Sequence, residues 1–536
     1  MADPSPPVSL PAVEYLELYN ASTDTVNLQK WVIQVGNNTA TINQSFLLAP
    51  GRFVVLCSPG MVHLLDTSIQ SIGITGFPAL DNDGAIVQLA APDGAILHAV
   101  AYHKTWYQAP AKINGGWSLE MIDVSKPCLA YTNWKASIDP AGGTPGKINS
   151  VAADVTDNQP PRLLRTYCTD SLTILAIFDE SLDAISAAEP SSWSISNGLN
   201  IQSAAPVSPL FNAVLLSLKQ PLQKGIEYLL QVIHVQDCSG NPIGGFNKVK
   251  AGLPEDPDAA SVFINEILFN PASGGSDYVE LFNGSKKILD LQDLFLASRN
   301  ATNGLQSITT CSSSPRLFFP GDHVVVTADS LFTQQQYLVK EPDNLIELST
   351  LPSMPDNAGI VVIVTKDSKV IDEMRYSEKW HFPLLNQREG VSLERISING
   401  PSNDPANWTS AASTVGFGTP TYRNSQVAEV NSGAEIFRIV PTVFSPDGDG
   451  NNDFAMIEFH FDRPGLMGTL TIFDMRGRPV RFLVTNTSLA QSGSFRWDGL
   501  DQHQRASPPG MYIVLLDVFS LQGKRKKYKG IVVLAK

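Results

Sequence analysis

The sequence predicts an all-β protein, built from tandem β-sandwich domains in an elongated arrangement. Short apolar and β-branched stretches alternate with turns rich in Gly, Pro, Asn and Asp along the whole chain, a pattern typical of strands joined by tight turns. Long periodic helical patterns are absent, and only residues 329–337 predict a short helix, with Asp329 as its N-cap. Charged residues make up 17% of the chain, less than the usual quarter, and turn-forming polar residues replace them.

A long internal repeat is the second observation. Residues 13–146 recur as residues 276–421, motif after motif and in the same order. The clearest matches are EYLELYN at 14–20 with DYVELFN at 277–283, and Gly-Thr-Pro at 143–145 with Gly-Thr-Pro at 418–420. A period this long indicates duplicated whole domains, because solenoid repeats are only 20–50 residues long.

The 536 residues are too many for one hydrophobic core. Polar or Pro-rich linkers at 154–161, 253–258 and 426–434 divide the chain. The sequence therefore predicts four domains, which are residues 1–152, 158–254, 259–425 and 435–536.

The second repeat copy opens with an apolar stretch, Val262–Leu268, that the first copy lacks. Residues 1–4 align with residues 268–271. This alignment predicts that the first copy is missing most of its opening strand. It also predicts that the chain is a fragment, or begins at an internal Met of a longer protein.

Composition argues against several classes of function. The net charge of −14 disfavours a nucleic-acid partner, because an acidic surface repels phosphate. The sequence contains no run of 18 apolar residues, so it predicts no transmembrane helix. The five cysteines form no CxxC pair, which argues against a zinc site. Cys168 and Cys238 fall in one predicted domain, either as a disulfide or as two buried thiols.

The segment DGDGNND at 447–453 is the strongest candidate metal site. Asp447, Asp449, Asn451 and Asp453 place oxygen atoms at alternate positions, which suits the 6–8 oxygen ligands of Ca²⁺. We therefore expect a structural calcium ion here. The alternative is a polar turn in which Asp and Asn bond to their own backbone. Glu458 has the spacing of a further ligand, but it lies in a predicted strand.

Four glutamates recur between the copies, Glu17 with Glu280 and Glu120 with Glu394. Paired carboxylates can act as general acid and base. Each of them, however, alternates with apolar residues in a predicted strand, so we interpret them as hydrogen-bonded structural residues.

The matched tryptophans are Trp106 with Trp380 and Trp134 with Trp408. They could stack on sugars at a sheet edge, but we expect them in the core, where a large ring buries most area.

No HExxH, GxSxG or Walker motif occurs. We therefore predict no catalytic residues and no enzymatic activity.

The basic run Lys524–Lys529 stands out in an acidic chain. It could contact lipopolysaccharide phosphate or a secretion receptor. Alternatively, its lysines protect an edge strand from unwanted pairing.

Several motifs support resemblances to known families. The repeated unit resembles the lamin-tail domain, an Ig-like sandwich, on the motifs 264–267, 278–283, 407–408 and 418–420. The second domain resembles the bacterial Ig-like domain of surface-layer-type proteins, on residues 178–183 and 235–242. The last domain is similar to the hook-capping Ig-like fold and to type IX secretion sorting domains of Bacteroidetes, on residues 444–453, 472–477, 497–499 and 509–513.

These resemblances imply tandem Ig-like sandwiches that are not catalytic. We expect a scaffold or adhesin that is secreted or lies on the extracellular face of the outer membrane. Its C-terminal domain would engage the type IX secretion machinery, and its other partners would be proteins or surface glycans. One alternative is the accessory part of a secreted nuclease or phosphatase whose catalytic domain lies upstream. Another is a subunit of an outer-membrane or secretion complex that docks by strand addition.

Overall fold

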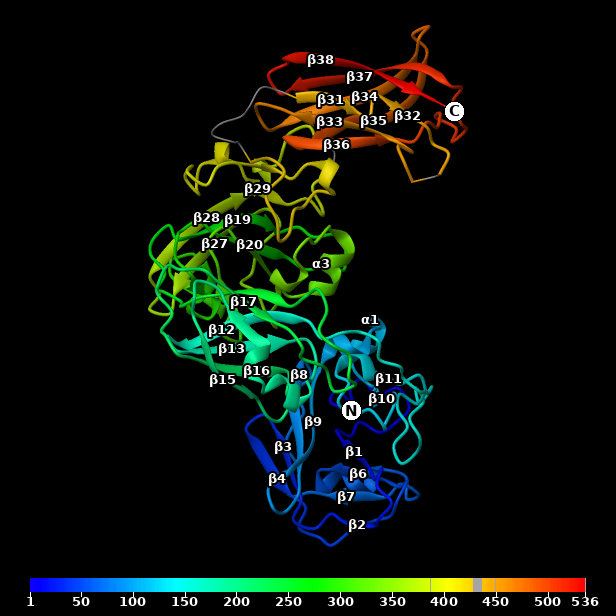
Figure 1. Ribbon diagram of the computed structural model, residues 1–536, viewed down its shortest axis with the longest axis vertical. Coiled ribbons are helices and arrows are strands. Elements are labelled where there is room, and N and C mark those ends of the chain that lie inside the picture. The colour runs from blue at the N-terminus through cyan, green and yellow to red at the C-terminus, as the bar shows by residue number, and fades with distance from the viewer. Residues whose placement is uncertain (386, 428–435, 449, 536) are drawn as a thin grey trace. The chain divides into compact units, whose positions relative to one another are not determined.

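The computed structural model describes residues 1–385, 387–427, 436–448 and 450–535. Strands dominate throughout these residues, so the predicted all-β class is confirmed (Figure 1). The chain divides into two compact units, residues 1–253 and 254–536. Each unit contains two of the four predicted domains, whose finer boundaries stay predictions.

Helical segments are short in the described residues. The predicted helix with Asp329 as its N-cap is confirmed, because the Asp329 carboxylate accepts the N–H of Phe332 at 2.8 Å. The α-helices are α1 (Pro110–Ile113), α2 (Ala184–Ala187) and α3 (Ser330–Gln336). The 3₁₀ segments are Pro59–Leu64, Lys104–Tyr107, Tyr131–Asn133, Pro190–Ser192, Leu291–Asp293, Pro342–Asn344, Glu378–Trp380, Pro405–Asn407 and Ser413–Val415.

The second repeat is a two-layer β-structure. Its larger sheet has the strand order β26-β25-β20-β19-β29-β30, and the facing sheet has the order β23-β22-β27-β28. Buried residues of both sheets form one hydrophobic core. The strands are β19 (Val262–Leu268), β20 (Tyr278–Asn283), β21 (Leu289–Asp290), β22 (Leu294–Arg299), β23 (Leu305–Thr310), β24 (Leu317–Phe318), β25 (His323–Thr327), β26 (Leu345–Glu347), β27 (Ala358–Thr365), β28 (Val370–Ser377), β29 (Leu393–Arg395) and β30 (Trp408–Ser410).

The first repeat has matching strands in matching order, with one exception. Its sheet β4-β3-β8-β9 corresponds to β23-β22-β27-β28, and its pair β2-β5 corresponds to β21-β24. The larger sheet is divided into β7-β6-β1 and β10-β11, because no strand of the described residues takes the place of β19. The strands are β1 (Leu16–Tyr19), β2 (Val26–Asn27), β3 (Val32–Val35), β4 (Asn38–Thr41), β5 (Leu47–Leu48), β6 (Phe53–Cys57), β7 (Ser71–Gly73), β8 (Gly84–Ala90), β9 (Ile96–His103), β10 (Leu119–Met121) and β11 (Trp134–Ala136).

The second domain of the first unit contains two sheets, β12-β13-β16-β15 and β14-β17-β18. Buried and partly exposed residues alternate along β13 and β16, as expected for strands with one face on a core. The strands are β12 (Leu163–Asp170), β13 (Thr173–Phe178), β14 (Trp193–Ile195), β15 (Ile201–Pro206), β16 (Ala213–Leu218), β17 (Tyr228–Val232) and β18 (Lys248–Ala251).

The C-terminal domain also has two sheets, β31-β33-β36 and β32-β38-β37-β34-β35, around a core that includes the fully buried Trp497. Long antiparallel registers join β37 to both β34 and β38. The strands are β31 (Ile436–Val440), β32 (Val443–Phe444), β33 (Ala455–His460), β34 (Leu466–Asp474), β35 (Pro479–Leu489), β36 (Ser492–Trp497), β37 (Gly510–Ser520) and β38 (Arg525–Leu534).

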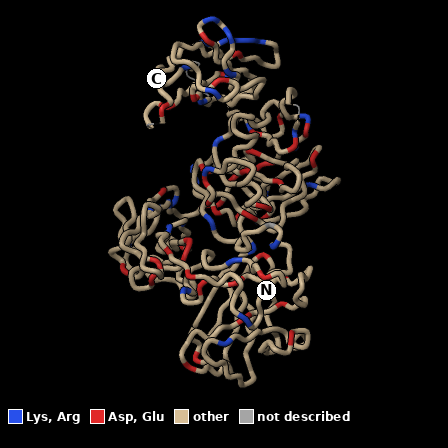
Figure 2. Tube along the Cα trace, turned by 90° about the vertical axis from the view of Figure 1, so that its right-hand side faces the viewer, with Lys and Arg blue, Asp and Glu red and all other residues tan. Residues whose placement is uncertain are grey.

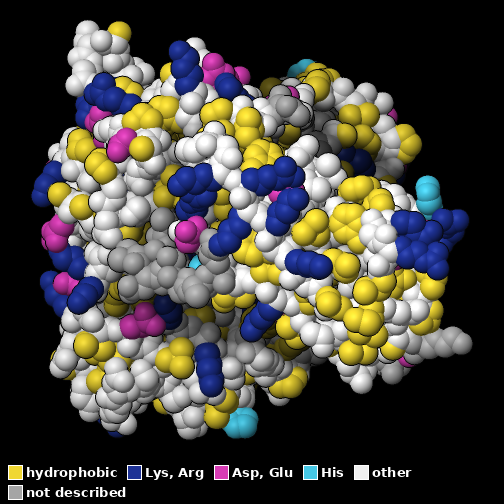
Figure 3. Space-filling view, turned by 90° about the horizontal axis from the view of Figure 1, so that it is seen from above, with side chains coloured by type: hydrophobic (Ala, Val, Ile, Leu, Met, Phe, Trp, Pro, Cys, Tyr) yellow, Lys and Arg dark blue, Asp and Glu magenta, His cyan; other side chains and the backbone are white. Residues whose placement is uncertain are grey.

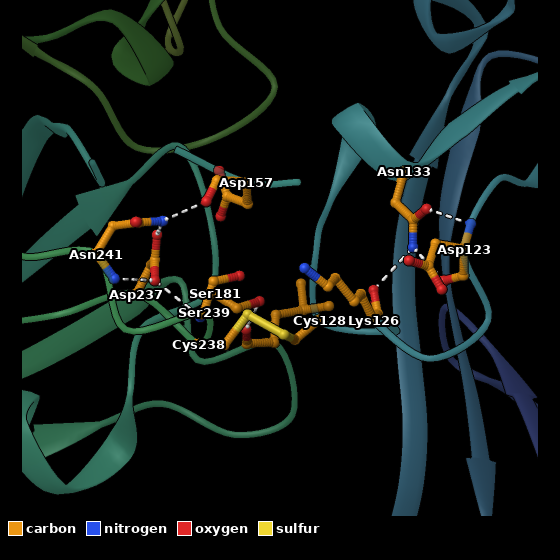
Figure 4. The surroundings of a disulfide bond; sticks show 11 residues. Asp123, Lys126, Cys128, Asn133, Asp157, Ser181, Asp237, Cys238, Ser239 and Asn241 are labelled. Atoms are coloured by element: carbon orange, nitrogen blue, oxygen red, sulfur yellow. Dashed lines mark hydrogen bonds between the residues drawn. A yellow bond between two sulfur atoms is a disulfide. The ribbon is translucent and has the colours of Figure 1, made fainter. Parts of the chain in front are cut away.

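The possible Cys168–Cys238 disulfide is not formed, and the alternative of two buried thiols holds for Cys168 alone. Cys238 forms a disulfide with Cys128, and their Cα atoms are 6.3 Å apart (Figure 4). Cys168 is a free, buried thiol on β12, and burial raises its pKa to about 12. The disulfide therefore links a loop of the first repeat to a loop of the second domain, rather than two strands of one sandwich.

Candidate functional site

Three fully buried glutamates form a polar cluster inside the second repeat. Glu266 lies on β19, Glu280 on β20 and Glu394 on β29. Thr419 of the Gly-Thr-Pro motif donates its N–H to Glu266 at 3.0 Å, and its hydroxyl lies 2.7 Å from Glu266 and 2.8 Å from Glu394. The N–H of Thr421 binds Glu280 at 2.7 Å. Such donors compensate the carboxylates for the loss of water.

The three glutamates of this cluster lie in the protein interior, and this location indicates a structural role. Burial raises the pKa of Glu280 to about 7, an effect that His323 partly offsets. Burial, followed by the charge of Glu266, raises the pKa of Glu394 to about 8. All three carboxylates are 0% exposed, so a substrate has no access to them.

The first repeat uses its matched glutamates in the same way. Glu17 accepts the N–H of Gly146 at 2.5 Å. Glu120 accepts from the hydroxyl of Thr144 at 2.8 Å and from the N–H of Ser150 at 2.7 Å. The prediction that the matched glutamates are hydrogen-bonded structural residues is confirmed.

Among the matched tryptophans, Trp408 is 3% exposed and donates its indole N–H to the carbonyl of Ser402 at 2.9 Å. Trp380 packs partly buried against the same core. The predicted core role is confirmed for these two. Trp106 and Trp134 of the first repeat are half-buried.

The candidate calcium loop has the geometry of a polar turn where it is described. The Asp453 carboxylate accepts the N–H groups of Gly448 at 2.7 Å and Gly450 at 3.0 Å. Asp447 and Asn451 are exposed. The fourth predicted ligand, Asp449, lies outside the described residues. The calcium site at this loop stays a prediction.

A second oxygen-rich cluster, in the second domain, was not predicted. Asp157, Glu180 and Asp237 each place a carboxylate oxygen within 4.8 Å of the others. Asp237 is 1% exposed, and the Oδ2 atom of Asp157 is buried without a hydrogen-bond partner. Burial, then the charges of Asp237, Asp179 and Asp157, raises the pKa of Glu180 to about 8. A hard divalent cation prefers such oxygen donors.

Figure 4 shows two members of this cluster, Asp157 and Asp237, near the disulfide. Asn241 donates its side-chain N–H to Asp237 at 2.8 Å and to the carbonyl of Asp157 at 3.3 Å. Asp237 directly precedes Cys238, which is bonded to Cys128. The three carboxylates come from a linker and two loops far apart in sequence. The only sequence signals were the acidic motifs at 178–183 and 235–242.

The basic run is a hairpin arm of the C-terminal domain. Arg525 and Lys527 on β38 both face Asp517 of β37. The outer neighbour β32 pairs only with Val533 and Leu534, at the other end of β38. This arrangement agrees with lysines that protect a sheet edge. On the face drawn in Figure 3, basic side chains stand among apolar ones.

Acidic and basic residues are scattered through both units (Figure 2). Within the described residues, no helix is long and apolar enough to cross a membrane.

Residues 438–534 match the family described as CHU_C Type IX secretion signal domain. This match confirms the predicted type IX sorting domain at the C-terminus. The chain is therefore exported to the cell surface or the extracellular space. No curated protein matches the chain.

Several solved structures have a distant likeness. The N-terminal part of the bacterial S-layer protein SbsC has 14% identity and a TM-score of 0.18, over 41% of this chain and 44% of that one. Latent PorU from Porphyromonas gingivalis has 11% identity and a TM-score of 0.15, over 84% of this chain and 40% of that one. A Ca²⁺-stabilized adhesin with which an Antarctic bacterium binds ice has 9% identity and a TM-score of 0.12, over 97% and 93%. The chain spans less than half of the SbsC fragment and of PorU, and scores this low carry no argument about function.

Proposed function

We propose that this protein is a non-catalytic scaffold or adhesin that its C-terminal domain delivers to the cell surface. The observation that carries the proposal is the type IX secretion signal match at residues 438–534. The signal domain follows a series of β-domains, in which the glutamates matched between the two repeats are hydrogen-bonded structural residues.

The use of the repeated motifs supports a non-catalytic role. An active site needs titratable groups that a substrate can reach. In the second repeat, the matched acids Glu280 and Glu394 are fully buried and bonded to backbone and hydroxyl donors. Duplication of such a unit therefore adds a second stable domain surface rather than a second active site.

Calcium would have a structural role in this proposal. The candidate sites are the Asp447–Asp453 loop and the cluster of Asp157, Glu180 and Asp237. A divalent cation bound at the cluster would offset the repulsion between its carboxylates. It would also give the Oδ2 atom of Asp157 a partner. We expect millimolar Ca²⁺ to raise the melting temperature of the full chain relative to EDTA. Asp453→Asn and Glu180→Gln variants would show which of the two sites responds.

A reporter fusion tests the export role. Residues 435–536 are fused behind a periplasmically targeted reporter in a host with type IX secretion. We expect the reporter on the cell surface or in the medium. A matched fusion that lacks residues 525–536, and thus β38, should stay in the periplasm. A complete fusion that stays in the periplasm would contradict the proposal.

A further inference from the structure

The outer face of one sheet of the C-terminal domain carries apolar residues that the domain core does not use. This is the five-stranded sheet β32-β38-β37-β34-β35, whose inner face packs on the core. Along each strand, successive side chains point to opposite faces, and side chains paired across neighbouring strands share a face. On β37, the fully buried Val514 and Leu516 of the core alternate with Ile513 and Leu515 of the outer face, which are only partly buried.

Two neighbouring rows of outer-face side chains consist of apolar residues paired from strand to strand. They are Val443, Val533 and Met511 in the first row and Ile531, Ile513 and Phe473 in the second. Leu515 and Phe482 follow in a third row, on either side of Thr471. Four members of this set, Val443, Met511, Ile531 and Phe482, are 46–50% exposed. Because paired side chains lie next to each other, the set forms one contiguous apolar surface, which is a mark of an interaction site.

Basic residues border this apolar surface on the same face. Lys529 is paired with Leu515, Lys527 with Asp517, and Arg525 with Phe519. All three basic side chains therefore lie on the outer face, where Asp517 forms ion pairs with Arg525 and Lys527. Three basic residues against one acidic residue leave this end of the face with a positive charge.

The charge of the whole C-terminal domain has the same sign. Residues 435–536 contain 13 Lys and Arg against 10 Asp and Glu, so their net charge is +3, whereas the net charge of the full chain is −14. A positive domain on an acidic chain favours a negatively charged partner.

Charge also argues against a second copy of the chain as the partner. Two identical faces packed about a two-fold axis would oppose their basic ends to each other, or bury them against the apolar rows. Both arrangements are unfavourable, since like charges repel and a charge buried without a partner loses its hydration. A partner that presents negative charge beside apolar groups suits both ends of the face.

We propose that this outer face binds an anionic lipid surface. The apolar rows would enter the boundary between headgroups and acyl chains, and Arg525, Lys527 and Lys529 would contact lipid phosphate. Buried apolar area and attraction of basic residues to anionic lipids both contribute to binding of this kind. The proposal goes beyond delivery by the C-terminal domain, because contact with lipid would retain the exported chain at the cell.

Binding of the purified full chain to sedimentable vesicles tests the proposal, independently of export. The probes are vesicles of phosphatidylcholine alone and vesicles of equal parts phosphatidylcholine and phosphatidylglycerol. We expect the chain to bind the neutral vesicles about 30-fold more weakly, because an excess of two basic residues contributes about fivefold each at an anionic surface. Added salt should weaken binding to the anionic vesicles, since it screens exposed charges.

A pair of substitutions tests the apolar rows. Phe482→Ser combined with Ile531→Ser should weaken binding to the anionic vesicles about tenfold, because less apolar area leaves water. The matched control is Ile436→Ser combined with Val440→Ser, which changes two residues on β31 of the other sheet that are 44% and 47% exposed. We expect this control to bind as the unchanged chain does.

Lys529→Gln tests the basic border separately. It changes an exposed position, so it probes the face even if the serine pair lowers the stability of the domain. We expect it to weaken binding to the anionic vesicles about fivefold and to reduce the effect of salt.

Three results would overturn the proposal. They are equal binding to both kinds of vesicle, a loss in the β31 control as large as in the pair of Phe482 and Ile531, and a full chain that binds no vesicles. In the last case, failure of the Phe482 and Ile531 pair to reach the cell surface would assign the face to a protein of the export machinery instead.

Discussion

The Gly-Thr-Pro motif recurs in both repeats because its Thr serves buried carboxylates. Thr419 contacts both Glu266 and Glu394, whereas Thr144 of the first repeat contacts Glu120. A polar residue in a hydrophobic core is retained when its neighbours would otherwise be left without partners. The sequence could reveal the motif, but only the fold shows which acids it serves.

Replacement of Thr419 by Val tests this role. The side chain keeps its shape and loses its hydroxyl, so two buried carboxylates each lose a donor. We expect the free energy of unfolding of the second unit to fall by about 2–3 kcal/mol in urea titrations. Thr144→Val is the matched control in the first unit, where we expect a smaller loss. A change below about 0.5 kcal/mol for Thr419→Val would contradict the role.

The buried glutamates also predict a pH dependence. Burial raises the pKa of Glu280 to about 7 and of Glu394 to about 8, so the folded state holds protons more tightly than the unfolded state. Their contribution is fully present below about pH 4.5 and is lost as the pH rises through 7 to 8. The second unit should therefore be more stable at pH 5 than at pH 8. Glu280→Gln should flatten this dependence, and a stability that rises from pH 5 to pH 8 would disprove it.

At the scale of elements, the Cys128–Cys238 disulfide joins two loops that are 110 residues apart in sequence. A cross-link across so long a segment restricts the unfolded chain. Disulfides persist in oxidising compartments, which agrees with an exported protein.

We expect reduction, or Cys238→Ser, to lower the free energy of unfolding of the first unit by about 2–5 kcal/mol. Mass spectrometry of a non-reduced digest should find the peptides of Cys128 and Cys238 joined. Cys168→Ala is the control and should keep that cross-link. A cross-linked peptide that contains Cys168 would refute the assignment.

The elements differ in how well the sequence predicts them. The short strands and α3 follow from local patterns, namely alternating apolar residues and the cap at Asp329. The missing counterpart of β19 follows from comparison of the two copies. The disulfide and the cluster of Asp157, Glu180 and Asp237 do not, because their members meet only after distant loops have been brought together by the fold. The possible pairing of Cys168 with Cys238 failed because two cysteines of one predicted domain need not lie close together in the fold.

At the scale of the whole molecule, the chain joins a C-terminal type IX secretion signal domain to β-domains whose matched glutamates are hydrogen-bonded structural residues. The net charge of −14 disfavours a phosphate-rich partner, because an acidic surface repels phosphate.

Surface exposure of the protein in its own type IX-competent cells tests whether the C-terminal domain delivers the chain. Intact cells are treated with a protease that cannot cross the outer membrane, and the protein is followed by immunoblot. We expect the full chain to be exposed to the protease, and a chain that ends at residue 434 to be retained in the periplasm and protected. A truncated chain that reaches the surface as efficiently as the full chain would contradict delivery by the C-terminal domain.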